Sequence, residues 1–244
     1  MELENKLINP RWSICDALAV LATAYLIKWL STLSPIKGWL TQIGTLICPA
    51  TPTLGYNLIV SFIILGIVYL IIGVLLKYRY HLSWSGVGFS KGKNDPWLML
   101  ITAITETFLL FVLIMAVDII VVHLLSIKAE PQASTEVVTT VYTWWGWVLS
   151  FVHLVVVAPL SEELFFRGFL FPAIGKLVGK MIPAAILTSV IFGLFHCDLV
   201  RFLPLTVGAF WFNYLYIRTG SIYSSMIAHG VWNFLMLVMV FVFD

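Results

Sequence analysis

Long apolar runs, broken by short polar stretches, follow one another along the chain. A helix needs about 20 apolar residues to cross the roughly 30 Å of hydrocarbon in a bilayer. Seven runs approach or exceed that length, and they lie near residues 13–33, 57–76, 97–125, 145–178, 182–200, 202–217 and 222–243. The pattern predicts an all-α fold, a polytopic transmembrane helix bundle of about seven to eight spans.

The fourth run, 145–178, is too long for one ideal span and contains Pro159 and Pro172. A proline inside a helix removes a backbone hydrogen bond, and its ring clashes with the preceding turn. We therefore expect a kink or a break near one of these prolines. Two pieces here, or entry of residues 37–50 into the bilayer, would give the eighth span.

Composition agrees with a chain surrounded by the lipid bilayer. Hydrophobic residues make up 61% of the 244 residues and charged residues only 11%, whereas roughly a quarter of an ordinary soluble domain is charged. The formal net charge of +2 is too small to indicate a nucleic-acid partner. Three scattered cysteines fit neither a disulfide framework nor a Cys-rich zinc site.

The distribution of Lys and Arg predicts the orientation, because cytoplasmic loops of membrane proteins are enriched in both. In a seven-span arrangement nine basic residues fall on one side and three on the other. The first set is Lys6, Arg11, Lys77, Arg79, Lys91, Lys93, Lys176, Lys180 and Arg218, and the second is Lys37, Lys128 and Arg201. We expect a cytoplasmic amino terminus, an outside carboxyl terminus and no cleavable signal peptide.

One charged cluster interrupts the fourth run. Glu162, Glu163 and Arg167 lie in strongly apolar sequence, where ionisable side chains are costly unless they are paired and face the protein interior. In a helix Glu163 and Arg167 are four residues apart and meet on one face, whereas Glu162 points about 100° away. Glu163 and Arg167 are therefore assigned a supporting role and Glu162 a chemical one. An architectural ion pair between helices is the alternative.

Two further polar groupings follow in the later runs. Phe192 and His196 share a helical face, so the aromatic ring is placed to support the imidazole. His229 and Asn233 lie one turn apart on another helix. Each grouping is weak alone, because a lone histidine on an apolar helix is commonly a packed core residue.

The depth of these polar groups links them. If the fourth and fifth runs form a hairpin near residues 179–182, Glu162 lies about 25 Å along one helix from the turn and His196 about 21 Å along the next. His229 and Asn233 lie about 13 and 19 Å beyond Gly220, just before the last run. Since no simple packing requirement gathers polar groups at one depth, the set is interpreted as an active site.

Hydrolysis of a peptide bond requires a base that activates water, a group that orients the water and donors for the developing oxyanion. Glu162 is the predicted base. His196 would hold the water, and His229 with Asn233 would form the oxyanion hole. All four residues are thus predicted to be catalytic.

A zinc ion is the alternative means of activating the water. Glu162, His196 and His229 supply three possible ligands and leave a fourth position for water. We favour hydrolysis without a metal or other cofactor, because the sequence contains no His-Glu-x-x-His helix. Asn233 also serves better as a hydrogen-bond donor than as a zinc ligand.

The ordered set Glu-Glu-x-x-x-Arg, Phe-x-x-x-His and His-x-x-x-Asn resembles the CPBP (CAAX-protease and bacteriocin-processing) intramembrane protease family, related to type II CAAX prenyl endopeptidases. The resemblance covers residues 145–240 and implies the residue roles given above, although the family has often been described as metalloproteases. It implies an intramembrane endopeptidase whose substrate is a membrane-associated peptide or protein, with a lipidated one among the options. Phe210, Trp211 and Phe212 depart from the smaller residues expected there.

The resemblance divides one integrated domain into two parts. Residues 1–140 are the N-terminal membrane helices, with about three spans, and residues 141–244 are the catalytic membrane core. Two other classes of protein stay open. Buried Glu, His and Arg also build proton relays in transporters and channels, although no repeat of the two halves is visible. A non-catalytic immunity or adaptor protein with this fold is the other class.

Other polar residues receive structural interpretations. His153 is expected to point away from the site, about 180° around the helix from Glu162. Cys197 faces elsewhere than its neighbour His196, which argues against a thiol nucleophile. Glu106 is expected near the depth of the site, where it would be able to pair with Arg167.

Overall fold

The computed structural model describes residues 7–93, 95–125, 141, 143–198 and 201–243. Within these residues every regular element is a helix. The α-helices are α2 (Ile14–Thr32), α3 (Ser34–Ile47), α4 (Pro52–Val74), α5 (Pro96–Leu125), α7 (Trp144–Phe151), α8 (Ala158–Glu163), α9 (Phe171–Val178), α10 (Met181–Phe195), α11 (Phe202–Thr219) and α12 (Ile222–Phe243). Three π-helical segments, η1 (Leu75–Arg79), η3 (Val152–Val157) and η4 (Leu164–Leu170), and one 3-10 turn, η2 (Trp84–Val87), complete the set.

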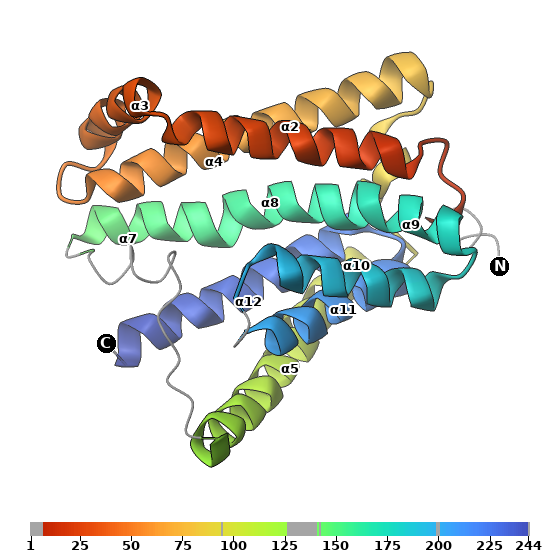
Figure 1. Ribbon diagram of the computed structural model, residues 1–244. Helices are drawn as coiled ribbons and strands as arrows, with labels where there is room; N and C mark the ends of the chain where they lie inside the picture. Colours follow the sequence, from red (N-terminus) through yellow and green to blue (C-terminus); the bar gives the residue numbers. More distant parts are fainter. Residues whose placement is uncertain (1–6, 94, 126–140, 142, 199–200, 244) are drawn as a thin grey trace.

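A long central helix, built from α7, η3, α8, η4 and α9 in succession, organises the bundle (Figure 1). On one side it packs against α2 and α4, and on the other against α10 and α12. Helix α11 pairs with α10, while α5 crosses the outer side of α12. Figure 1 shows that α2 begins and α12 ends at opposite ends of the molecule.

The predicted helical membrane bundle is confirmed, with corrections to its spans. In the part of the chain that the structure describes, five helices are long and apolar enough to cross a membrane: Ile14–Thr32, Pro52–Arg79, Pro96–Ala116, Trp144–Val178 and Ile222–Val240. The predicted run 182–200 is too long, because α10 ends at Phe195 and has only 15 residues. Helix α11, with 18 residues, is outside the set of five. Residues 37–50, which were considered as one source of an eighth span, lie largely in α3 (Ser34–Ile47).

The central helix is continuous through both prolines, so the predicted break is absent. Pro159 and Pro172 each lie one residue inside an α-helical segment that directly follows a π-helical one. At these junctions the amide of Ala158 donates to the carbonyl of His153, and that of Phe171 to the carbonyl of Phe166. The wider π turns move carbonyls away from the proline rings, which removes the clash that would break an α-helix.

The N-terminal segment is joined to the central helix through one buried core. The indole of Trp12 stacks on Phe169 with ring centroids 4.9 Å apart, and its nitrogen donates to the Phe169 carbonyl at 2.8 Å. Tyr80, just after η1, donates to the carboxylate of Asp16 at 2.7 Å. Burial and this hydrogen bond raise the pKa of Tyr80 to about 12, so the phenol keeps its proton and the start of α2 stays attached to the end of η1.

Candidate active site

The two adjacent acids lie at the end of α8 in different environments. The side chain of Glu163 is fully buried, whereas that of Glu162 is 33% exposed. Successive helical positions point about 100° apart, so the chain separates the two carboxylates by rotation alone. The helix thus presents one acid to the protein interior and leaves the other accessible.

Arg167 lies on η4 with no exposed surface, and its guanidinium is held from several directions. Nη1 donates to Glu163 Oε1 at 2.8 Å, as the four-residue spacing predicts, and Nη2 donates to the Ala209 carbonyl of α11 at 2.9 Å. The faces of Phe192 and Phe212 lie 5.0 and 5.2 Å from the guanidinium carbon. These contacts offset part of the cost of burying a cation.

His229 of α12 bridges the two acids. Its Nδ1 lies 2.7 Å from Glu163 Oε1, and its Nε2 lies 3.9 Å from Glu162 Oε2. Glu163 also binds the permanently charged Arg167, so it acts as an ionised acceptor and Nδ1 must carry the hydrogen between them. The imidazole therefore presents its other nitrogen to Glu162, at a distance beyond a direct hydrogen bond.

Phe192 stands between the two histidines. His196 follows the last residue of α10, and its Nδ1 donates to the Phe192 carbonyl at 2.8 Å. The Phe192 ring lies 4.8 Å from the His196 ring and 5.8 Å from the His229 ring, centroid to centroid. Since a carbonyl only accepts, Nε2 of a neutral His196 is free to accept a hydrogen bond. Phe192 supports His196 by ring and carbonyl, in agreement with their shared helical face.

Asn233 is engaged with the main chain of the central helix. Its amide nitrogen donates to the carbonyl of Leu154 at 2.8 Å. Leu154 lies five residues before Pro159, and in the π-helical pattern its carbonyl would accept from that residue, which has no N–H. The Asn233 amide therefore replaces the missing donor. One hydrogen of its NH2 group remains for another acceptor.

The zinc alternative was tested on the arrangement of its three predicted ligands. Among the residues that the structure describes, no three His, Cys, Asp or Glu side chains stand close enough to share a metal ion. Glu162, His196 and His229 are therefore not gathered around one point in this structure, and hydrolysis without a metal stays a prediction.

Glu106 pairs with a different arginine from the one predicted. Its carboxylate accepts from both terminal nitrogens of Arg218 on α11, at 3.0 and 2.9 Å. The predicted pairing with Arg167 is wrong, because α5 packs along α12 and α11 and meets the last turn of α11. His153 Nε2 forms a hydrogen bond of 2.8 Å with the hydroxyl of Ser61 on α4. The imidazole therefore lies on the side away from the site, as predicted.

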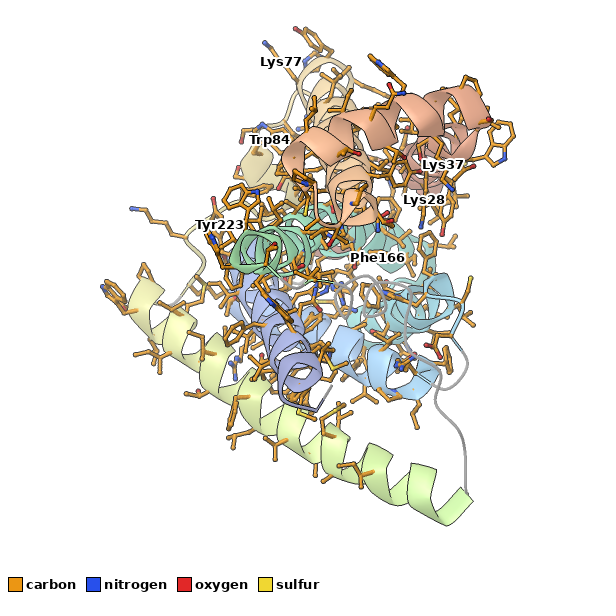
Figure 2. All side chains as sticks on the ribbon, turned by 90° about the vertical axis from the view of Figure 1, so that its left-hand side faces the viewer. Lys28, Lys37, Lys77, Trp84, Phe166 and Tyr223 are labelled. Atoms are coloured by element: carbon orange, nitrogen blue, oxygen red, sulfur yellow. The ribbon has the colours of Figure 1, made fainter. Side chains whose placement is uncertain are left out.

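Several contacts of the cluster were missed at the level of sequence. Phe212 stacks on the His229 ring with centroids 5.0 Å apart and an interplanar angle of 17°. The Ala209 and Leu154 carbonyls are main-chain acceptors without a sequence signal. Phe212 did have a sequence signal, because a bulky residue stood where a smaller one was expected. In Figure 2 Phe166, whose ring lies 4.9 Å from Phe192, marks the position of this aromatic cluster inside the bundle.

An apolar cavity of about 590 Å³ lies beside the cluster, along the seam between the central helix and α12. Its walls include Val155 and Pro159 on one helix and Gly230 and Phe234 on the other. Gly230 follows His229, and Phe234 follows Asn233. A Cβ on Gly230 would lie 2.9 Å from the Val155 carbonyl, so the glycine permits close helix contact. The four residues predicted to be catalytic are not among the residues that line the cavity, so the cavity lies along a neighbouring face of α12.

Residues 143–235 match the sequence model of the family described as "Type II CAAX prenyl endopeptidase Rce1-like". The match contains every residue predicted to be catalytic or supporting. This match covers less than half of the chain. The chain is also similar to the "Putative membrane peptidase YdiL" of Bacillus subtilis (strain 168), with 36% identity over 84 residues, which is 34% of this chain and 34% of that relative.

The YdiL alignment therefore spans about a third of that relative's length. No solved structure matches the chain. The family match and the similarity to YdiL confirm the resemblance read from the motifs.

Proposed function

We propose that the chain is an intramembrane endopeptidase that hydrolyses peptide bonds close to the membrane, in the manner of CAAX-type prenyl-protein proteases. The observation that carries the proposal is the division between two adjacent carboxylates. Glu163 is sequestered with Arg167 and His229, whereas Glu162 is 33% exposed and faces the free nitrogen of the same imidazole. An accessible carboxylate beside a fixed imidazole is what general-base hydrolysis requires.

In the proposed reaction Glu162 removes a proton from a water molecule. The water oxygen forms a bond to the carbonyl carbon of the scissile peptide, and the carbonyl π electrons move to its oxygen. The proton on Glu162 then passes to the leaving amine as the C–N bond breaks, which restores the carboxylate. A single water is able to bridge the 3.9 Å between Glu162 Oε2 and His229 Nε2.

The hydrogen-bond pattern constrains how His229 stabilises the oxyanion. Its Nδ1 hydrogen is used by Glu163, so donation from Nε2 requires the doubly protonated ring. In that form His229 and Arg167 supply two positive charges opposite the two carboxylates. When Glu162 takes up the water proton, the negative charge moves to the substrate oxygen. The total charge of the cluster and the substrate is therefore unchanged.

His196 and Asn233 complete the proposed site from its two sides. Nε2 of His196 accepts a hydrogen bond from the attacking water and thereby orients its lone pair. The remaining amide hydrogen of Asn233 donates to the oxyanion, while its other hydrogen stays on the Leu154 carbonyl. Asn233 is thus proposed to act on the substrate and on the helix seam at once.

The substrate is proposed to be a membrane-associated peptide or protein. The apolar seam between the central helix and α12 is suited to an apolar segment, a lipidated one included. Cells that carry either the wild-type chain or Glu162→Gln are compared by proteomics of membrane peptides. We expect peptides cut only in the wild-type cells. Identical peptide sets at equal protein levels would contradict the proposed peptidase.

A further inference from the structure

A polar cavity of about 230 Å³ lies where residues 84–93 meet the turn between α11 and α12. Lys91, Lys93, Ser90 and Tyr216 are among the residues that line it. None of the described residues lining the cavity is acidic. It lies at the end of α11, on the side that the Lys and Arg distribution predicts to be cytoplasmic. The cavity has no part in the proposed hydrolysis.

Hydrogen bonds hold the loop that forms one wall of this cavity. The Lys93 amide donates to the Thr219 carbonyl at 2.9 Å, and the Ser90 hydroxyl donates to the Gly220 carbonyl at 2.9 Å. In return the Ser221 hydroxyl donates to the Ser90 carbonyl at 2.6 Å. These bonds satisfy the carbonyls at the end of α11, so the negative end of that helix is partly neutralised toward the cavity.

Two glycines allow the loop to approach so closely. Gly88 and Gly92 have φ values of 94° and 76°, which favour glycine. A Cβ on Gly88 would lie 2.6 Å from the Tyr216 hydroxyl, and one on Gly92 would lie 2.7 Å from the Thr219 carbonyl. The loop therefore packs closely against α11, which is possible because Gly88 and Gly92 carry no Cβ.

Aromatic contacts fix the other end of the same loop. Phe89 lies between Trp84 and Tyr223, with ring centroids 5.7 and 5.6 Å away. Figure 2 shows Trp84 and Tyr223 on the same side of the bundle. The loop is thus held on both sides of Lys91, and the backbone that carries the two lysines is organised in advance.

Tyr216 supplies the observation that points to a ligand. Only 1% of this residue is exposed, and its hydroxyl has no hydrogen-bond partner among the residues that the structure describes. The side chain borders the cavity beside Gly88. The hydroxyl oxygen is not among the fully enclosed polar atoms that lack a partner, so a ligand in the cavity can reach it. The exposed ammonium groups of Lys91 and Lys93 likewise have no ion-pair partner within the described part of the chain.

We propose that this cavity binds a phosphate group. The Tyr216 hydroxyl donates one hydrogen bond to it, and Lys91 and Lys93 neutralise its charge. A phosphate supplies several strong acceptor oxygens and fits a cavity of this volume, whose described lining residues offer three donors and include no acid. Two sources carry this chemistry: the headgroup of an anionic phospholipid in the adjacent leaflet, and free phosphate. The inference is independent of the peptidase activity.

The test measures thermal unfolding of the purified full chain in a zwitterionic detergent. Phosphatidylglycerol, phosphatidylcholine and inorganic phosphate are titrated separately, and an apparent Kd is obtained from the rise in Tm. We expect phosphatidylglycerol or inorganic phosphate to raise Tm, and phosphatidylcholine to have a much smaller effect. A response to the lipid alone assigns the site to a headgroup, and a response to both assigns it to the phosphate group itself.

Variants show whether the response comes from this cavity. Lys91→Gln/Lys93→Gln should weaken the apparent affinity about 30-fold, since each lysine near an anionic surface contributes about fivefold. Tyr216→Phe, which keeps the ring and removes the donor, should weaken it about tenfold. The control Lys28→Gln/Lys37→Gln removes the same charge from α2 and α3, on the other side of the view in Figure 2, and should retain the response.

Absence of any shift in wild-type Tm would overturn the proposal. So would a shift that is equal in the wild type and in Lys91→Gln/Lys93→Gln. Both lysines are exposed, so this variant should fold, and it decides the outcome even if Tyr216→Phe lowers the Tm without ligand. A loss of peptidase activity in any of these samples has no bearing on the result, because binding is read from unfolding.

Discussion

The Glu163–Arg167 pair and the Glu106–Arg218 pair use the same two side-chain types in opposite settings. The first joins two turns of the central helix, has no exposed surface and shares its carboxylate with His229. The second joins α5 to α11 through two hydrogen bonds, and each side chain is 31% exposed. By geometry alone the bidentate exposed pair is the better ion pair.

The comparison shows that burial, rather than geometry, sets what each pair does. Desolvation of two charges offsets most of their attraction, so a buried pair adds little net stability while its disruption is very costly. An exposed pair is screened and contributes little in either direction. The buried pair therefore fixes one arrangement of Glu163 and His229, whereas the exposed pair only fastens a helix at the edge of the bundle.

The largest expected effect comes from breaking the buried pair. Arg167→Ala leaves Glu163 charged without its cation and removes the donor to the Ala209 carbonyl. We expect a loss of about 3–5 kcal/mol in stability, because an uncompensated charge is left in the interior. Folded yield and thermal unfolding in detergent measure it, with Arg218→Ala as the control. Normal accumulation with loss of turnover alone would make Arg167 a direct participant.

The next effect separates the two adjacent acids. Glu162→Gln should lower kcat by about 100-fold to 10,000-fold, the range for removal of a general base. Its unfolding should match the wild type, since this carboxylate makes no hydrogen bond to another described residue. Glu163→Gln should lower both folded yield and kcat, because its partners Arg167 and His229 are buried. Equal stability losses in the two variants would remove the division of roles.

A smaller effect is expected at Asn233, where two roles must be separated. Asn233→Ala should lower kcat by about 100-fold to 1,000-fold through loss of an oxyanion donor, with little change in KM. It also removes the donor to the Leu154 carbonyl. Pro159→Ala would restore a backbone N–H for that carbonyl. The double variant should regain stability while kcat stays low, and recovery of kcat as well would make Asn233 purely structural.

Metal dependence is measured on the same purified samples. If Glu162 and His196 activate water directly, turnover should survive exhaustive chelation. If zinc is held by Glu162, His196 and His229, chelation should abolish turnover and added zinc should restore it, with Asn233→Ala comparatively mild. Stoichiometric zinc together with chelator sensitivity would replace the mechanism and leave the peptidase assignment in place.

The features that were predicted correctly depend on local spacing. Four residues along a helix bring side chains to one face, and this rule placed Glu163 on Arg167 and Phe192 beside His196. The apolar runs indicated where the helices lie, because a span needs about 20 consecutive apolar residues. The order of the motifs indicated a resemblance to one family, and the match of residues 143–235 to the model of the Rce1-like endopeptidases confirms the resemblance.

The features that were missed depend on which residues of a neighbouring helix lie opposite a given helical face. Arg218 meets Glu106 from 112 residues away, and Phe212 covers His229 from a neighbouring helix. Spacing cannot fix the rotation of one helix against another. The π turns were missed for a related reason, because Pro159 alone does not show whether a helix breaks or widens to avoid its ring.

The smallest expected effect belongs to the exposed pair and completes the comparison. A double-mutant cycle with Glu106→Gln, Arg218→Gln and their combination should give a coupling energy of about 1 kcal/mol or less. The coupling should fall as salt is raised, since screening acts on partly exposed charges. The same cycle on Glu163 and Arg167 should give a larger coupling that salt barely changes. A coupling of several kcal/mol at Glu106 would mean that bidentate geometry outweighs burial, contrary to the comparison of the two pairs.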